Sequence, residues 1–92
     1  MIDPRFDQLA HVLVNHSTDL QKNEHVLIES FDIPEDMIVA LVRAVREVGA
    51  IPQVSIKHAR VHRELLLNAQ ELGMEMAGNY EAFRMKKMDA YI

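Results

Sequence analysis

The pattern that most constrains the fold is a strand, a helix and a second strand within residues 25–57. Residues 25–29 read His-Val-Leu-Ile-Glu, and three apolar residues in a row between polar ones are typical of a short strand buried on both faces of a parallel sheet. Residues 52–57 alternate apolar and polar side chains, which predicts an edge strand with Pro52 tolerated at its first position. Two strands joined by one helix in roughly 33 residues form a βαβ unit. The chain is therefore expected to be an α/β domain with parallel strands.

The helix between these strands has signals at both of its ends. Asp32 is expected to cap its first turn, and Glu35 follows three residues later, as in a capping box. Gly49 is expected to occupy the left-handed position just after the last turn. The predicted inner face consists of Met37, Ile38, Leu41, Ala44, Val45 and Val48.

A first helix is predicted close to the start of the chain. Asp3 can accept hydrogen bonds from its free N–H groups, and Pro4 suits its first position. Its buried face is predicted to consist of Phe6, Leu9, Ala10, Leu13 and Val14, spaced as on one side of a helix. Residues 17–19 interrupt this pattern, and a turn follows in which Asn23 best tolerates the left-handed conformation.

Helical spacing returns after the second strand. It is carried by Val61, Leu65, Leu66 and Ala69. Gly73 is expected to break this helix, and a last helix is expected over residues 74–88 with Met76, Tyr80 and Phe83 facing inward.

The final residues, 89–92, resemble a turn that leads into a third strand. We therefore expect one incomplete domain over residues 1–92. It would be a small parallel sheet of strand order 2-1-3 with helices on both faces. Because an incomplete sheet exposes an unpaired strand edge, self-association through this truncated edge is expected.

Charge and cysteine content exclude several classes of protein. The formal charge is −4, which argues against a general affinity for nucleic acid. The chain has no cysteine, so disulfides and thiolate metal sites are excluded. It shows neither a secretory signal nor an apolar run near the roughly 18 residues of a membrane helix, so a cytoplasmic location is expected.

The candidate metal ligands are weak. His58 and His62 stand four residues apart and could share a helix face, as in zinc sites. No glutamate follows the first histidine, and Arg60 beside the pair disfavours a cation, so surface histidines are the preferred interpretation.

Residues 29–32 end the first predicted strand, at the edge where open α/β sheets bind ligands. Glu29 and Asp32 could touch a substrate or a neighbouring domain there, but strand closure and helix capping are the preferred roles. The run of Arg84, Lys86 and Lys87 is interpreted as a solvated helix face. No Gly-rich phosphate loop or nucleophile elbow is present, so no catalytic, metal-binding or cofactor-binding residue is predicted.

Several stretches in one register, spread over essentially the whole chain, carry a resemblance to a known family. They are residues 3–6 with Leu9 and Ala10, then 26–29, 31–35, 41–44 and 48–50, then Arg60, Val61, Leu65 and Leu66, then Met85 and 87–92. Together they resemble the amino-terminal domain of the aminopeptidase T family, the thermophilic-type leucyl metallo-aminopeptidases. The chain departs from the family pattern at Asn23, where glycine is usual, and at His58 and Ala59, where Asp-Ser is typical. Residues 74–79 match nothing in that pattern.

The resemblance implies an amino-terminal fragment of a metal-dependent aminopeptidase, a hydrolase that removes amino-terminal residues from peptides. It implies two divalent metals, zinc or cobalt, held in a later catalytic domain whose ligand motifs match no position here. The chain itself is then expected to be inactive, and peptide substrates would bind only to the full-length parent. The alternative is a stand-alone binding or interaction module derived from that domain.

Overall fold

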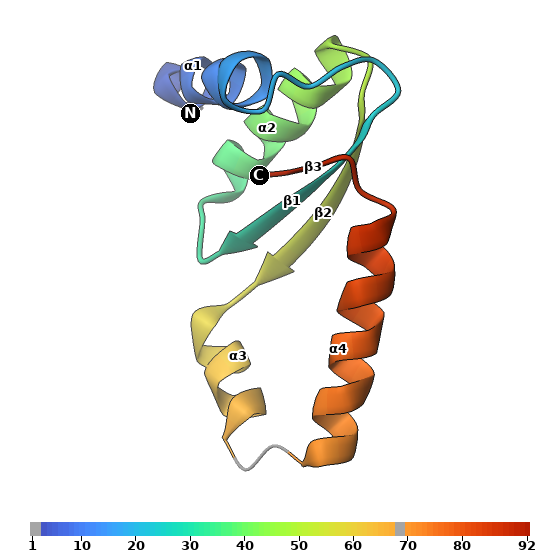
Figure 1. The fold of residues 1–92 in the computed structure, drawn as a ribbon. Helices are drawn as coiled ribbons and strands as arrows, with labels where there is room; N and C mark the ends of the chain where they lie inside the picture. The colour runs from blue at the N-terminus through green and yellow to red at the C-terminus, as the bar shows by residue number, and fades with distance from the viewer. Residues whose placement is uncertain (1–2, 68–69) are drawn as a thin grey trace.

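The computed structural model describes residues 3–67 and 70–92, which form a three-stranded parallel sheet with four α-helices (Figure 1). The elements follow in the order α1 (Pro4–Val12), η1 (Leu13–Ser17), β1 (His25–Phe31), α2 (Glu35–Glu47), β2 (Ile51–Lys57), α3 (Ala59–Leu66), α4 (Glu71–Lys86) and β3 (Ala90–Tyr91). The strand order is β2-β1-β3. The predicted α/β class, strand order and edge position of β2 are confirmed.

Strand pairing follows the predicted βαβ unit. β1 and β2 pair in parallel, with His25 beside Ile51 and Phe31 beside Lys57. β3 pairs in parallel with the other edge of β1, with Val26 beside Ala90. The predicted end of the first strand at Glu29 is wrong, because ladder pairing with β2 continues two residues further, to Phe31.

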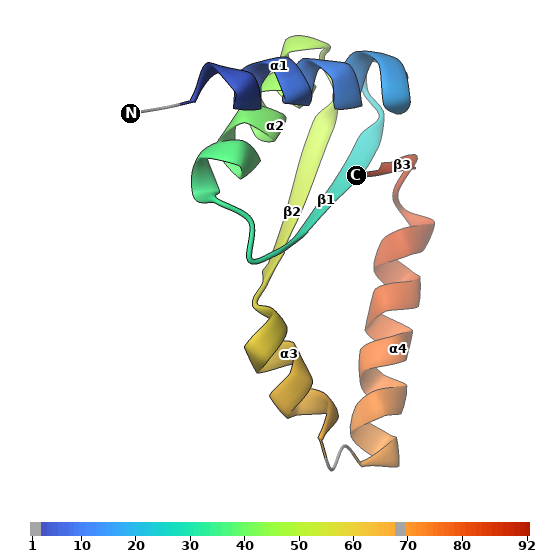
Figure 2. The same ribbon diagram turned by 90° about the vertical axis from the view of Figure 1, so that its left-hand side faces the viewer.

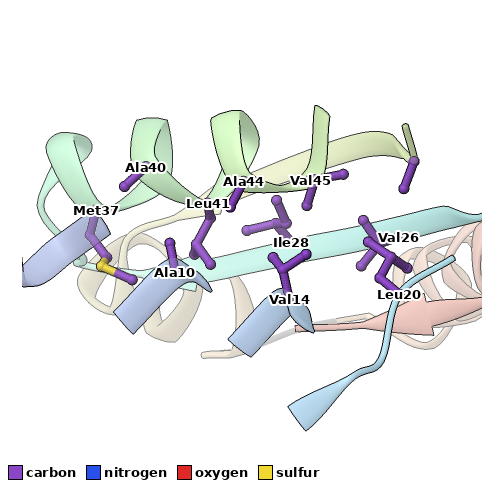
Figure 3. Close-up of a cluster of buried hydrophobic side chains, with 11 residues drawn as sticks. Ala10, Val14, Leu20, Val26, Ile28, Met37, Ala40, Leu41, Ala44 and Val45 are labelled. Atoms are coloured by element: carbon purple, nitrogen blue, oxygen red, sulfur yellow. The ribbon is translucent and has the colours of Figure 1, made fainter. Parts of the chain in front are cut away.

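One face of the sheet carries the hydrophobic core (Figure 3). There α1 and α2 pack against each other and over β1, and the side chains of Val26 and Ile28 project into the space between them. The buried cluster consists of Ala10, Val14, Leu20, Val26, Ile28, Met37, Ala40, Leu41, Ala44, Val45 and Ala50. The amphipathic patterns of the first two helices therefore predicted this core, although Leu9 stays half exposed and Val48 is only partly buried.

The first helix ends in a widened turn. The Thr18 N–H donates to the Leu13 carbonyl, five residues back, at 3.0 Å, and the Thr18 hydroxyl donates to the same oxygen at 2.7 Å. This π-type turn over η1 closes the helix where residues 17–19 were expected to interrupt it. Asn23 has the predicted left-handed backbone, with φ of 68°.

The start of α2 differs from the sequence-based expectation. Pro34 is the residue that precedes the helix, and no side chain caps its first turn. The predicted capping box of Asp32 and Glu35 is wrong, because Asp32 lies two residues before the cap position and has a φ of 53°. At the other end of α2, Gly49 has the predicted left-handed backbone, with φ of 79°.

The last two helices form a hairpin beyond the carboxyl ends of β1 and β2 (Figures 1 and 2). The hairpin lengthens the molecule to 42 × 31 × 16 Å. Gly73 does not break the helix as expected but lies in the first turn of α4. The predicted helical residue Ala69 lies outside the described residues. The predicted inward side chains of Met76, Tyr80 and Phe83 are wrong, since each is at least 64% exposed.

No helix within residues 3–67 and 70–92 combines the length and apolar character needed to span a bilayer.

Candidate functional site

The face of the sheet opposite the core carries a cluster of charged side chains where α4 passes it. Because side chains alternate along a strand, Glu29 and Lys57 project away from Val26 and Ile28, on the side of α4. Lys57 Nζ donates to Glu29 Oε1 at 3.1 Å. Glu81 of α4 lies 4.0 Å from the same Nζ. The second pair of helices therefore reaches this face through polar side chains.

A second ion pair continues the cluster along α4. Arg84 Nη2 donates to Glu81 Oε2 at 2.6 Å, one helical turn apart. The Arg84 side chain is only 18% exposed, and its Nε is buried with no partner among the described residues. The prediction that Arg84 belongs to a solvated basic face is therefore wrong. We call Glu29, Lys57, Glu81 and Arg84 the ion cluster.

The ion cluster perturbs the ionisation of one member, Glu29, and of the neighbouring Tyr91. The hydrogen bond from Lys57 lowers the pKa of Glu29, against the opposing effect of burial, and the nearby Tyr91 hydroxyl lowers it further. Burial raises the pKa of the Tyr91 hydroxyl, and the nearby Glu29 carboxylate adds to that rise. Glu29 is therefore held as a carboxylate and Tyr91 as a neutral phenol at neutral pH.

The chemistry of the ion cluster is that of a clamp. Two carboxylates face two cations, so each charge is compensated and no general base is left poised for proton transfer. Lys57 Nζ also lies 5.6 Å from the centre of the Phe31 ring. The cluster joins β1, β2 and α4 through charged side chains that are widely separated in the sequence.

Asp32 has a second linking role at the end of β1. Its Oδ2 accepts from the Ala59 N–H at 3.1 Å, and its Oδ1 lies 3.1 Å from His58 Nδ1. Asp32 therefore caps α3, not α2. Of the two residues singled out at this edge, Asp32 has a capping role on another helix, and Glu29 lies within β1 as a member of the ion cluster.

His58 and His62, the candidate metal pair, contact different residues. His58 lies against Asp32, whereas the His62 ring meets Phe31 edge to face with 5.5 Å between centroids. Within residues 3–67 and 70–92, no three His, Cys, Asp or Glu side chains come together as metal ligands. His11 lies near Glu47, with Nε2 and Oε2 3.5 Å apart, and His25 begins β1 as expected.

A hollow of about 420 Å³ adjoins the ion cluster between the two helices of the hairpin. Its lining is mostly apolar, and Lys57 and Glu81 lie at its edge. The apolar part is formed by Leu65, Leu66, Gly73, Met74 and Ala77. The arrangement combines an apolar hollow with a charged rim on the side of the sheet away from the core.

Of the four residues of the ion cluster, only Glu29 was singled out from the sequence as a candidate site residue, and none was predicted to form ion pairs. Lys57 could have been found, because it ends β2 at the same sheet edge as Glu29 and alternates with Val54 and Ile56. Glu81 and Arg84 have the i, i+3 spacing of a helical ion pair. Their approach to the sheet has no local signal.

Comparison with solved structures shows a likeness of fold. No protein-family model and no curated protein matches the chain. The chain is similar to wild-type AmpT from Thermus thermophilus, with a TM-score of 0.62 and 20% sequence identity. The similarity covers 79% of this chain and 19% of the AmpT chain, so this chain spans about a fifth of that protein's length. The likeness shows that a small parallel α/β unit of this fold occurs within AmpT.

Proposed function

We propose that the chain is the amino-terminal scaffold domain of a metal-dependent aminopeptidase. The observation that carries the proposal is the agreement of a likeness in sequence with a likeness in fold. The sequence resembles the amino-terminal domain of the aminopeptidase T family over essentially the whole chain, and the fold resembles part of AmpT over 79% of the chain. The fold supports the architecture, and the sequence resemblance supports the activity of the parent protein.

The domain's role in that protein is to wall the active-site cavity and to limit entry to short peptides. The α3–α4 hairpin suits this role, because it extends beyond the sheet and carries an apolar hollow with a charged rim. The ion cluster and the Asp32 cap hold the hairpin at its two ends. The chain itself contributes position and shape, and the protein works in the cytoplasm.

The two divalent metals, zinc or cobalt, belong to the rest of the parent. The residues described here do not fit a two-metal site, because they bring no three suitable ligands together. Peptide bond hydrolysis by metal-activated water would therefore use residues of another domain.

The test compares the 92-residue chain with the product of its whole reading frame. Both are assayed for release of amino-terminal residues from amino-acid amides and short peptides, with zinc or cobalt supplied and then removed by a chelator. We expect chelator-sensitive turnover from the whole product and none from the chain alone. Turnover by the chain alone would refute its scaffold role. An inactive whole product would refute the aminopeptidase assignment.

The second candidate is a stand-alone interaction module of the same fold. It is favoured by the apolar side chains exposed on the hairpin, among them Leu65, Leu72 and Met76 at 70%, 80% and 76% exposure. A reading frame that ends at Ile92, together with no aminopeptidase activity, would select this candidate.

A further inference from the structure

Helix α4 carries a stripe of four exposed apolar side chains on one side. Leu72, Met76, Tyr80 and Phe83 are 80%, 76%, 64% and 65% exposed. Because each helical residue is rotated by about 100° from the last, the spacing of four, four and three residues places them within an arc of about 80°. We call these four residues the α4 stripe.

The α4 stripe is not the side of the helix that faces α3. The α3 side is formed by Gly73, Met74 and Ala77, which line the hollow between the two helices. The helix is therefore apolar on two sides, and a helix that is apolar nearly all round is normally buried. The Arg84 guanidinium lies 5.8 Å from the centre of the Tyr80 ring, and Lys87 Nζ lies 5.5 Å from the centre of the Phe83 ring. These two cations lie over part of the stripe, and all four of its side chains remain largely exposed.

The charges on α4 indicate what covers the stripe. Its first half carries Glu71 and Glu75, and its end carries Lys86 and Lys87. If a second α4 lies antiparallel against the stripe, the acidic half of each helix faces the basic end of the other, and the helix dipoles also oppose favourably. A parallel arrangement would place like charges together.

This charge pattern is self-complementary, which is what a two-fold axis between identical chains requires. The area is also sufficient for a modest dimer. At these exposures the four side chains present roughly 600 Å² per copy. With flanking polar residues this approaches the roughly 800 Å² that each partner buries in a standard interface.

We infer that the chain forms a two-fold homodimer in which the α4 helices of two copies pack antiparallel through the α4 stripe. This interface differs from the β3 edge, where the sequence predicts self-association. It is also independent of the aminopeptidase assignment.

Sedimentation velocity over a range of concentrations tests the inference. Met76→Glu places a carboxylate in the stripe and is expected to weaken dimerisation at least tenfold. Because Met76 is exposed, the variant should keep the circular dichroism spectrum of the wild type.

A charge exchange tests the antiparallel direction. Glu75→Lys and Lys86→Glu each place like charges together twice in the dimer, so each is expected to raise the dissociation constant about three- to tenfold. The double variant restores both contacts and should return to within about threefold of the wild type. Glu64→Lys, on α3, makes the same change in net charge as Glu75→Lys and should leave the dimer unchanged.

Three results would overturn the inference. One is a chain that stays monomeric at every concentration. The second is a dimer that withstands Met76→Glu but is lost in Tyr91→Pro, which would place the contact at the β3 edge. The third is a double charge variant no tighter than either single one.

Discussion

The Asp32 carboxylate accepts a hydrogen bond from the backbone N–H of Ala59, 27 residues further along the chain, at 3.1 Å. The bond joins the end of β1 to the first turn of α3. Asp32 has a φ of 53°, so its backbone also turns at this point and its N–H donates to the Lys57 carbonyl at 3.2 Å.

Removing this cap should loosen α3. We expect Asp32→Ala to lower the free energy of unfolding by about 1–2 kcal/mol, since it removes a cap and places alanine in the left-handed region. Asp32→Gly also removes the cap, but glycine adopts the positive φ without strain, so the loss of unfolding free energy should be smaller than for Asp32→Ala. Urea unfolding measures both changes. Asp32→Asn keeps an acceptor oxygen and should stay closest to the wild type, and a loss equal to that of alanine would contradict the cap.

Glu29 should make stability depend on pH in the acid range. Its pKa in the folded chain is lowered below the usual value of 4.5. Its stabilising effect is therefore complete above pH 4.5 and is lost as the pH falls through the folded pKa. Glu29→Gln should cost about 1 kcal/mol near pH 7 and nothing once the pH is below that folded pKa.

Unfolding free energies of the wild type and Glu29→Gln between pH 7 and the acid limit of folding check this difference. Hydrogen bonds from Arg5 also lower the pKa of Asp3, so Asp3 affects the unfolding free energy in the same acid range. This effect is equal in both proteins and cancels in the difference between them. Glu64→Gln, an exposed carboxamide substitution on α3, serves as the matched control. A constant difference between wild type and Glu29→Gln at all pH values would contradict the role of the Lys57 pair.

Ser30 is the one buried polar residue of the described core, and its hydroxyl has no hydrogen-bond partner there. Because an unpaired buried hydroxyl costs free energy, Ser30→Ala should raise the stability by about 1 kcal/mol. Thermal unfolding of the two proteins measures the change. A clear loss of stability in Ser30→Ala would indicate a partner for the hydroxyl, such as an ordered water.

Gly49 and Gly78 should respond to alanine in opposite ways. At Gly49, φ is 79° and an added Cβ would lie 3.0 Å from Lys22 Cγ, so Gly49→Ala should cost about 1–2 kcal/mol. At Gly78, within α4, an added Cβ meets nothing within 4 Å, so Gly78→Ala should stabilise the chain by about 1 kcal/mol. Chemical denaturation of Gly49→Ala and Gly78→Ala measures both changes in unfolding free energy. Equal changes in the two variants would contradict the prediction.

Local sequence patterns determined the elements of the first part of the chain and their class. The apolar run of residues 26–28 predicted a strand buried on both faces, and the amphipathic pattern after it predicted the crossover helix. The two patterns differ because a strand buried on both faces is apolar at every residue, whereas a helix buried on one face is apolar every three to four residues. Asp3, Asn23 and Gly49 were predicted correctly, since their roles depend on the backbone of their own few residues.

Only the tertiary structure decided which distant side chains meet. Asp32 reads as a cap for the helix that follows it, but the turn at its positive φ directs its carboxylate to α3. Arg84 reads as solvated and pairs locally with Glu81, and only the passage of α4 beside the sheet brings Glu81 to 4.0 Å from Lys57. The inward side of α4 was predicted wrongly as that of Met76, Tyr80 and Phe83, because apolar residues lie on two sides of the helix and periodicity cannot choose between them. Long-range pairing depends on where whole elements pack, and that information is not present in any local window of sequence.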